Sequence, residues 1–201
     1  MNNAARVLAS ALFVACAASV SAQSWLAPSP QVFASVSGTY GFKTQPLKSD
    51  CRSNPSLRKN APDAAQVRCD VLGASQGMLF ALAPDGSEVV VWKGFLLNAP
   101  HRAMVTDDGK YVVTLDVWAR LGYESCLVIY DEHGVVVASF NLEALLAKEE
   151  IARFVFQADG SRQWLRGGKV EFNDRSDRVV VTLSWGKVIS IVLADGKIDA
   201  A

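Results

Sequence analysis

The strongest constraint on the fold is a pattern that occurs four times: an aliphatic run, a short turn that ends on glycine, and a second aliphatic run. The turns are Asp85-Gly86, Asp107-Asp108-Gly109, Asp131 to Gly134 and Asp195-Gly196. Glycine supplies the positive φ that a tight turn needs, and an Asp side chain accepts hydrogen bonds from turn amides. The pattern predicts a mainly β chain of antiparallel hairpins or meanders.

A longer repeat joins these hairpins into larger units. Residues 111–118 resemble residues 179–185 at an offset of 68, and the turn at 131–134 corresponds to 194–196 at an offset of 62. An extra loop at 119–125 accounts for the difference. Residues 78–92 resemble part of the same unit. The sequence therefore predicts a β-rich unit used twice, with a partial third copy.

One short helix interrupts the hairpins. Asn141 is followed by Leu142, Leu145 and Leu146, which is the i, i+3, i+4 spacing of one helical face. Asparagine is a favoured N-cap residue. We expect a helix near 142–150, followed by a strand over Phe154-Val155-Phe156 and a turn at Asp159-Gly160.

The first 22 residues have the pattern of a secretory signal peptide. Arg6 precedes an apolar run at 7–18, and Val20-Ser21-Ala22 suits a signal peptidase. The apolar run is shorter than the roughly 20 residues of a spanning helix, and we expect no membrane span. Cleavage near Ala22 predicts a periplasmic or secreted protein. The alternative is a lipoprotein, because Phe13-Val14-Ala15-Cys16 resembles a lipobox in which Cys16 is lipidated.

Cleavage leaves Cys51, Cys69 and Cys126, and export places them in an oxidising compartment. Cys51 and Cys69 lie in the polar segment 43–70, and we expect a disulfide between them worth roughly 3 kcal/mol. Cys126 opens an apolar run and is predicted to be a buried thiol. The three cysteines lack the paired C-x-x-C spacing of structural zinc sites, so no metal is expected.

We expect one domain after the signal peptide. Residues 23–77 hold a strand near 31–37 and the disulfide-stapled loop, and residues 78–201 form the hairpin repeat region. The loop has a local charge of +3, which suits either a solvated loop or one that contacts an anion or partner. The whole chain has 20 basic and 20 acidic residues, and loss of Arg6 leaves a charge of −1. This balance argues against a dedicated nucleic-acid binder.

The hairpins resemble blades of bacterial β-propellers of the YVTN or PQQ-like type. Residues 105–113 and 128–131 carry the resemblance, which covers roughly residues 78–199. It implies sheets arranged as blades, although propellers have four or more blades and this chain has room for about three. Three alternatives follow: a partial propeller, a sandwich or curved sheet, or self-association that completes a propeller. Blades imply no activity by themselves.

The candidate binding residues lie in and before the extra loop: Asp116, Trp118, Arg120 and Tyr123. Two aromatic rings with two polar side chains suit a small-molecule or glycan ligand. In the alternative interpretation Trp118 packs in the core, and Asp116 with Arg120 is a surface pair.

The sequence favours an exported, non-catalytic β domain that binds a protein, a small molecule or a glycan, or has a structural role in the cell envelope. No cofactor is expected. The alternative is a hydrolase-like envelope enzyme in which His101 acts as general base with a carboxylate such as Asp116. The other histidine, His133, lies in a turn and is expected to be exposed. The sequence contains no G-x-S-x-G, H-E-x-x-H or P-loop motif.

Overall fold

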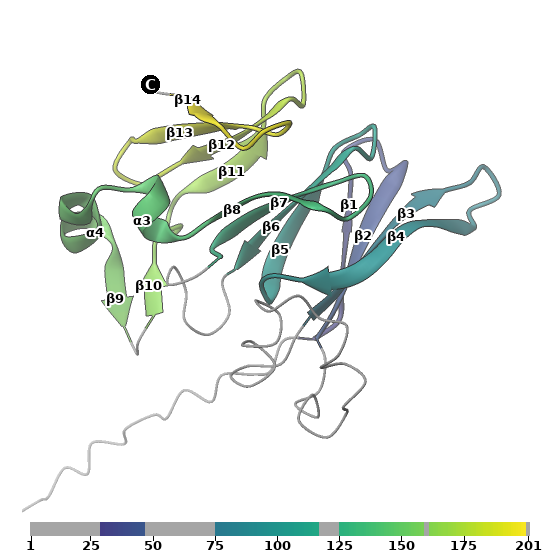
Figure 1. Ribbon diagram of the computed structural model, residues 1–201, viewed down its shortest axis with the longest axis horizontal. Helices are drawn as coiled ribbons and strands as arrows, with labels where there is room; N and C mark the ends of the chain where they lie inside the picture. The colour runs from purple at the N-terminus through teal and green to yellow at the C-terminus, as the bar shows by residue number, and fades with distance from the viewer. Residues whose placement is uncertain (1–28, 47–74, 117–124, 159–160, 200–201) are drawn as a thin grey trace, which may run out of the picture.

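The computed structural model of the chain describes residues 29–46, 75–116, 125–158 and 161–199 (Figure 1). Three antiparallel sheets of four strands follow one another along this part of the chain, and neighbouring strands in each sheet are consecutive in sequence. The first sheet contains β1 (Gln31–Ala34), β2 (Tyr40–Pro46), β3 (Ser75–Leu82) and β4 (Glu88–Leu96). The second contains β5 (Pro100–Val105), β6 (Tyr111–Asp116), β7 (Leu127–Asp131) and β8 (Val136–Phe140). The third contains β11 (Lys169–Phe172), β12 (Arg178–Thr182), β13 (Val188–Val192) and β14 (Ile198–Asp199).

The prediction of a mainly β chain of antiparallel meanders is confirmed. The four predicted turns lie between strands of one sheet, and Gly86, Gly109, Gly134 and Gly196 all have positive φ, between 69° and 80°. The strand predicted near 31–37 is shorter than expected, since β1 ends at Ala34. β2 continues to Pro46, past residue 43, where the polar loop was predicted to begin.

The turn between the first and second strands has the same hydrogen bonds in all three sheets. Its first residue is Ser35, Thr106 or Asn173, and the side-chain oxygen accepts from the backbone N–H five residues later, at 3.2, 3.1 and 3.0 Å. The backbone N–H of the first residue donates to the carbonyl of that later residue. Three residues after the first, the backbone has positive φ in every case: Gly38, Gly109 and Ser176.

The hairpin of the third and fourth strands is also repeated between the first two sheets. Leu79 pairs with Trp92 on β4, and Ile129 pairs with Ala138 on β8. One residue further along, both ladders shift register by one residue, which leaves an extra residue on the fourth strand. The segment 78–92 therefore occupies the same place in the first sheet as 128–138 in the second.

The second sheet lies between the other two. One of its faces, with Val112 and Tyr130, packs on Phe42 and Trp92 of the first sheet. The other face joins the core of the third sheet and the helices, where its members are Val113, Leu115, Leu127 and Ile129. Strands covered on both faces bury consecutive side chains, which explains the unbroken apolar run of β7. Cys126, immediately before β7, is fully buried, as predicted.

The helical segment is two short helices, α3 (Leu142–Leu145) and α4 (Lys148–Phe154). Asn141 caps the first, as predicted, because its Oδ1 accepts from the Ala144 N–H at 2.9 Å. The chain turns at Leu146, which has extended backbone angles and is buried in the same core cluster as Ile151. Phe154 ends α4, so the predicted strand starts later, with β9 (Phe156–Ala158) paired to β10 (Ser161–Gln163).

Several predictions fall outside the described residues: the signal peptide at 1–22, the Cys51–Cys69 disulfide and the turn at 159–160. Within the described ranges, neither helix has the length and apolar character needed to cross a membrane.

Candidate functional site

The predicted binding residues begin where β6 ends. Asp116 is the last residue of β6 and pairs with Pro100 at the start of β5. Trp118, Arg120 and Tyr123 lie in 117–124, outside the described residues. The structure nevertheless shows how both ends of that segment are held.

A buried asparagine ties these two ends together. Asn98 is 2% exposed, and the Thr114 hydroxyl donates to its Oδ1 at 2.9 Å. Its Nδ2 donates to the carbonyl of Ser125 at 3.1 Å and lies 3.5 Å from the carbonyl of Thr114. Leaving a buried amide without partners costs about 1–3 kcal/mol, so this network resists separation of the two ends. The segment 117–124 therefore starts from a fixed base.

Asn98 is not among the site residues predicted from the sequence. Its signal is an isolated asparagine directly after the apolar run that ends β4, in Leu96-Leu97-Asn98. Nothing in the sequence indicates which carbonyls such an amide contacts, because Thr114 and Ser125 are 16 and 27 residues away.

His101 lies beside the same base. Pro100 pairs with Asp116 and Arg102 pairs with Leu115, which makes His101 an extra, bulged residue of β5. The ladder thus brings His101 and Asp116 to one end of the second sheet, and β-bulges of this kind commonly redirect side chains next to functional sites. Burial lowers the pKa of His101, because desolvation disfavours the imidazolium. A neutral imidazole at pH 7 is able to accept a proton or a hydrogen bond.

The opposite end of the second sheet has a small polar cleft of about 270 Å³. Lys110, Asp131, Glu132 and His133 contribute charged or titratable groups to its lining. These groups already take part in turn structure: Asp131 Oδ1 accepts from the backbone N–H of His133 at 2.9 Å, and Lys110 Nζ lies 3.2 Å from Asp108. The Asp108 carboxylate also raises the pKa of Lys110. His133 is exposed, as predicted. The cleft suits a small polar molecule but offers few uncommitted groups.

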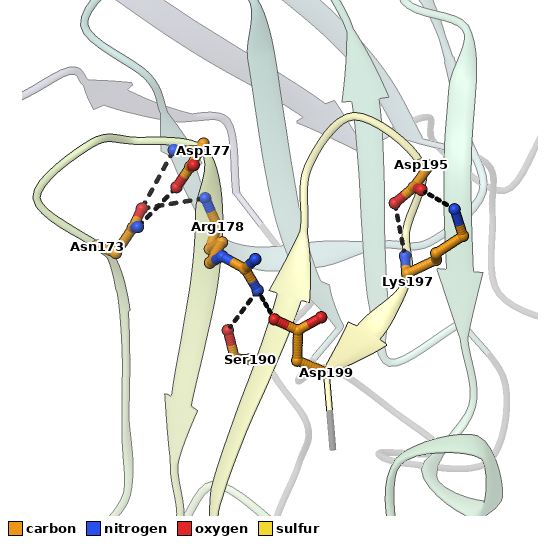
Figure 2. A network of polar contacts seen from close by, with 7 residues as sticks. All are labelled: Asn173, Asp177, Arg178, Ser190, Asp195, Lys197 and Asp199. Atoms are coloured by element: carbon orange, nitrogen blue, oxygen red, sulfur yellow. Dashed lines mark hydrogen bonds and ion pairs between the residues drawn. The ribbon is translucent and has the colours of Figure 1, made fainter. Parts of the chain in front are cut away.

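The third sheet carries a polar network that is structural (Figure 2). Arg178 on β12 pairs with Asp199 on β14, and its Nη1 lies 3.4 Å from Ser190 Oγ on the strand between them. At the adjacent turn, Asn173 Nδ2 donates to Asp177 Oδ1 at 2.6 Å. Because these polar groups bond to one another, the network stabilises the pairing of β12, β13 and β14. It leaves few polar groups available to bind a ligand.

Three tryptophans outside this segment have a packing role. Trp92 and Trp164 are buried in the two core clusters, and Trp185 is half-buried against one of them. Of the positions that the structure describes, the base around Asn98, His101 and Asp116 is thus the best candidate site.

Among the described side chains, no three His, Cys, Asp or Glu residues are grouped so as to hold a metal ion.

A scan against models of protein families finds no match to this chain, and a search of curated proteins finds none that is significantly similar.

Proposed function

We propose that the protein is an exported, non-catalytic binding domain whose ligand-binding side is the end of the second sheet where residues 117–124 emerge. The observation that carries this proposal is the Asn98 network, which holds Thr114 and Ser125 on either side of that segment. Binding residues commonly lie on loops that a rigid scaffold positions. A buried polar network that fixes the residues on either side of a binding segment is typical of such a scaffold.

The residue types of the segment indicate the ligand class. Trp118 and Tyr123 supply aromatic faces, and Asp116 and Arg120 supply hydrogen-bonding groups of both charges. Aromatic rings with a few polar groups are the usual lining of small-molecule sites. A small molecule or glycan of the cell envelope fits this composition, and it is the ligand we propose.

Calorimetric titration with soluble peptidoglycan fragments and neutral oligosaccharides tests the proposal. We expect one of these ligands to bind the purified mature protein and Trp118→Ala to abolish the binding. Phe156→Ala removes an exposed aromatic ring on β9 and is the matched control. Equal binding by the Trp118→Ala variant, or no binding of any of these ligands by the wild type, contradicts the proposal.

Export is the second part of the proposal, and the sequence of residues 1–22 supports it. N-terminal sequencing of the protein from a periplasmic fraction is expected to start at Gln23. A start at Cys16 that carries a labelled fatty acid would show the lipoprotein instead. Recovery of the uncleaved chain in the cytoplasm contradicts export.

We also propose that the three sheets are related as blades of the propeller type. Support comes from the turn hydrogen bonds that Ser35, Thr106 and Asn173 share, and from the four-stranded meander of each sheet. A crystal structure tests the relation, since blades are superposed by repeated rotation about one common axis. Sheets that superpose only through unrelated rotations would show a different architecture.

A hydrolase-like activity is a second candidate, and one observation favours it. The bulge places His101 next to Asp116 in the strand ladder, and burial lowers the pKa of the imidazole. A screen with chromogenic esters tests this activity, with His101→Ala as the inactivating change and His133→Ala as the control. Turnover that survives His101→Ala contradicts the assignment of this base.

A further inference from the structure

The outer edge of the first sheet is long and available for pairing. β4 has nine residues, whereas the corresponding fourth strands β8 and β14 have five and two. Within the described residues β4 is bonded to β3 only, so its other edge presents backbone N–H and C=O groups. Edges of this kind are templates for pairing with another strand, and proteins usually shorten or cover them.

The side chains at this edge are also apolar. Val89, Val90 and Val91 are 55%, 54% and 44% exposed. Val90 pairs with Phe80 and Trp92 pairs with Leu79, so Val91 is the extra residue of a bulge. Three consecutive exposed valines on an unpaired edge, without a proline, form a surface suited to strand addition.

The charges at the two ends of this run indicate what the partner is. Glu88 and Lys93 are exposed, and they lie opposite Leu82 and Met78 of β3. These two β3 residues are four positions apart, so Glu88 and Lys93 point to the same face of the sheet. When a second copy of β4 is placed antiparallel, Glu88 of each chain faces Lys93 of the other. The strand is thus complementary in charge to itself.

We propose that two copies of the chain pair through β4 in an antiparallel, two-fold symmetric arrangement with the axis between Val90 and Val91. The two first sheets then form one continuous sheet of eight strands, and the valines of the two copies become cross-strand neighbours. The interface is isologous, the commonest form for a homodimer. Glu88, which already pairs with Lys43 of its own chain, gains a second lysine from the partner subunit.

Sedimentation velocity on the mature protein over a concentration series tests the proposal with two charge variants. Lys93→Glu places Glu opposite Glu twice, and Glu88→Lys places Lys opposite Lys twice. We expect each variant alone to dimerise about tenfold more weakly than the wild type. An equimolar mixture of the two restores both complementary pairs, and we expect it to recover the dimer as a heterodimer. Lys169→Glu, an exposed change on β11, is the control.

Hydrogen exchange provides the structural readout. We expect concentration-dependent protection of amides in 88–93 and none in β8. A wild type that stays monomeric up to about 100 μM overturns the proposal, as does a dimer that both variants form as well as the wild type. Protection confined to another strand overturns it too. If the protein stays monomeric and binds an added β-strand peptide of unrelated sequence at this edge, the edge has a different partner and the proposal is overturned.

Discussion

The ring of Tyr40 occupies the space that a Cβ on Gly109 would need, with only 2.3 Å between that Cβ position and Tyr40 Cε1. Gly109 lies in the first turn of the second sheet, and Tyr40 starts β2 of the first sheet. The same close approach recurs between Gly134 and the Trp92 ring. Gly109 and Gly134 thus meet two conditions: positive φ within the turn and contact with an aromatic ring of the preceding sheet.

The two conditions can be separated by comparing two glycine-to-alanine variants. At Gly86, φ is 80° and nothing lies within 4 Å of an added Cβ, so Gly86→Ala is expected to cost only about 1–2 kcal/mol of backbone strain. Gly109→Ala adds the clash with Tyr40, and overpacking costs about 1–3 kcal/mol more. Urea unfolding of both variants checks this order. Equal losses would show that Tyr40 moves aside freely.

Ser176 is the exception among the turn residues with positive φ, because it is not glycine and has φ of 53°. We expect Ser176→Gly to stabilise the protein by up to about 1 kcal/mol, since it removes the left-handed strain of a residue with a Cβ. Thermal unfolding then shows an increase in Tm of about 2–4 °C. Ser139→Gly on β8 is the control and is expected to lower Tm. A decrease in Tm for Ser176→Gly would contradict the strain argument.

Removing one hydrogen bond of the Asn98 network is expected to lower stability and to loosen the attachment of residues 117–124. Thr114→Val keeps the side-chain shape but removes the donor to Asn98 Oδ1, and we expect a loss of about 1–3 kcal/mol. Limited proteolysis is expected to cut faster within 117–124 in this variant. Thr182→Val, a matched change on β12, is the control. Unchanged cleavage in 117–124 would show that the network does not hold this segment.

Acid is expected to weaken the attachment of α4 to the third sheet. Lys187 Nζ donates to Glu150 Oε2 at 2.6 Å, and the Ala147 N–H donates to the same atom at 2.9 Å. These hydrogen bonds, that from Lys187 first, lower the pKa of Glu150. A lowered folded-state pKa gives stability that is present above the unfolded value of about 4.3 and is lost as the pH falls through the folded value.

Chemical denaturation at pH 6 and at pH 3 measures this effect. Glu150→Gln is expected to lose less stability between these two pH values than the wild type loses. Glu149→Gln removes the same charge from the same helix without touching Lys187, so it is the control. Identical pH dependence of the two variants would contradict the role of Glu150.

Local chemistry made part of the fold predictable. The Asp-Gly turns, the Asn141 cap and the burial of Cys126 each depend on a few neighbouring residues, and the structure confirms all three. The repeat was predicted in part. Residues 111–115 and 179–183 lie in or directly after the second strand of their sheets, but the equivalent turn bonds end at Tyr111 and Arg178, an offset of 67 where 68 was predicted.

Long-range pairing was less accessible to sequence reasoning. Pro46 pairs with Ser75 across an intervening segment of 28 residues, and no local pattern specifies that register. Two of the three equivalent turns escaped detection: that from Ser35 to Tyr40 has Gly38 but no Asp-Gly pair, and that from Asn173 to Arg178 has Ser176 in place of glycine. Of the candidate site, Asp116 and His101 were identified, whereas Asn98 was not, because its role depends on distant carbonyls.

The Asn98 network also affects which parts of the sequence can be replaced. Because the Asn98 network joins the ends of β6 and β7 directly, we expect the sheets to form whatever the length or sequence between 117 and 124. Insertions and replacements there are expected to be tolerated, whereas the same changes in the tight glycine turns are not. The domain is therefore suited to carry grafted loops, and a library of such segments could be selected for new ligands on one unchanged scaffold.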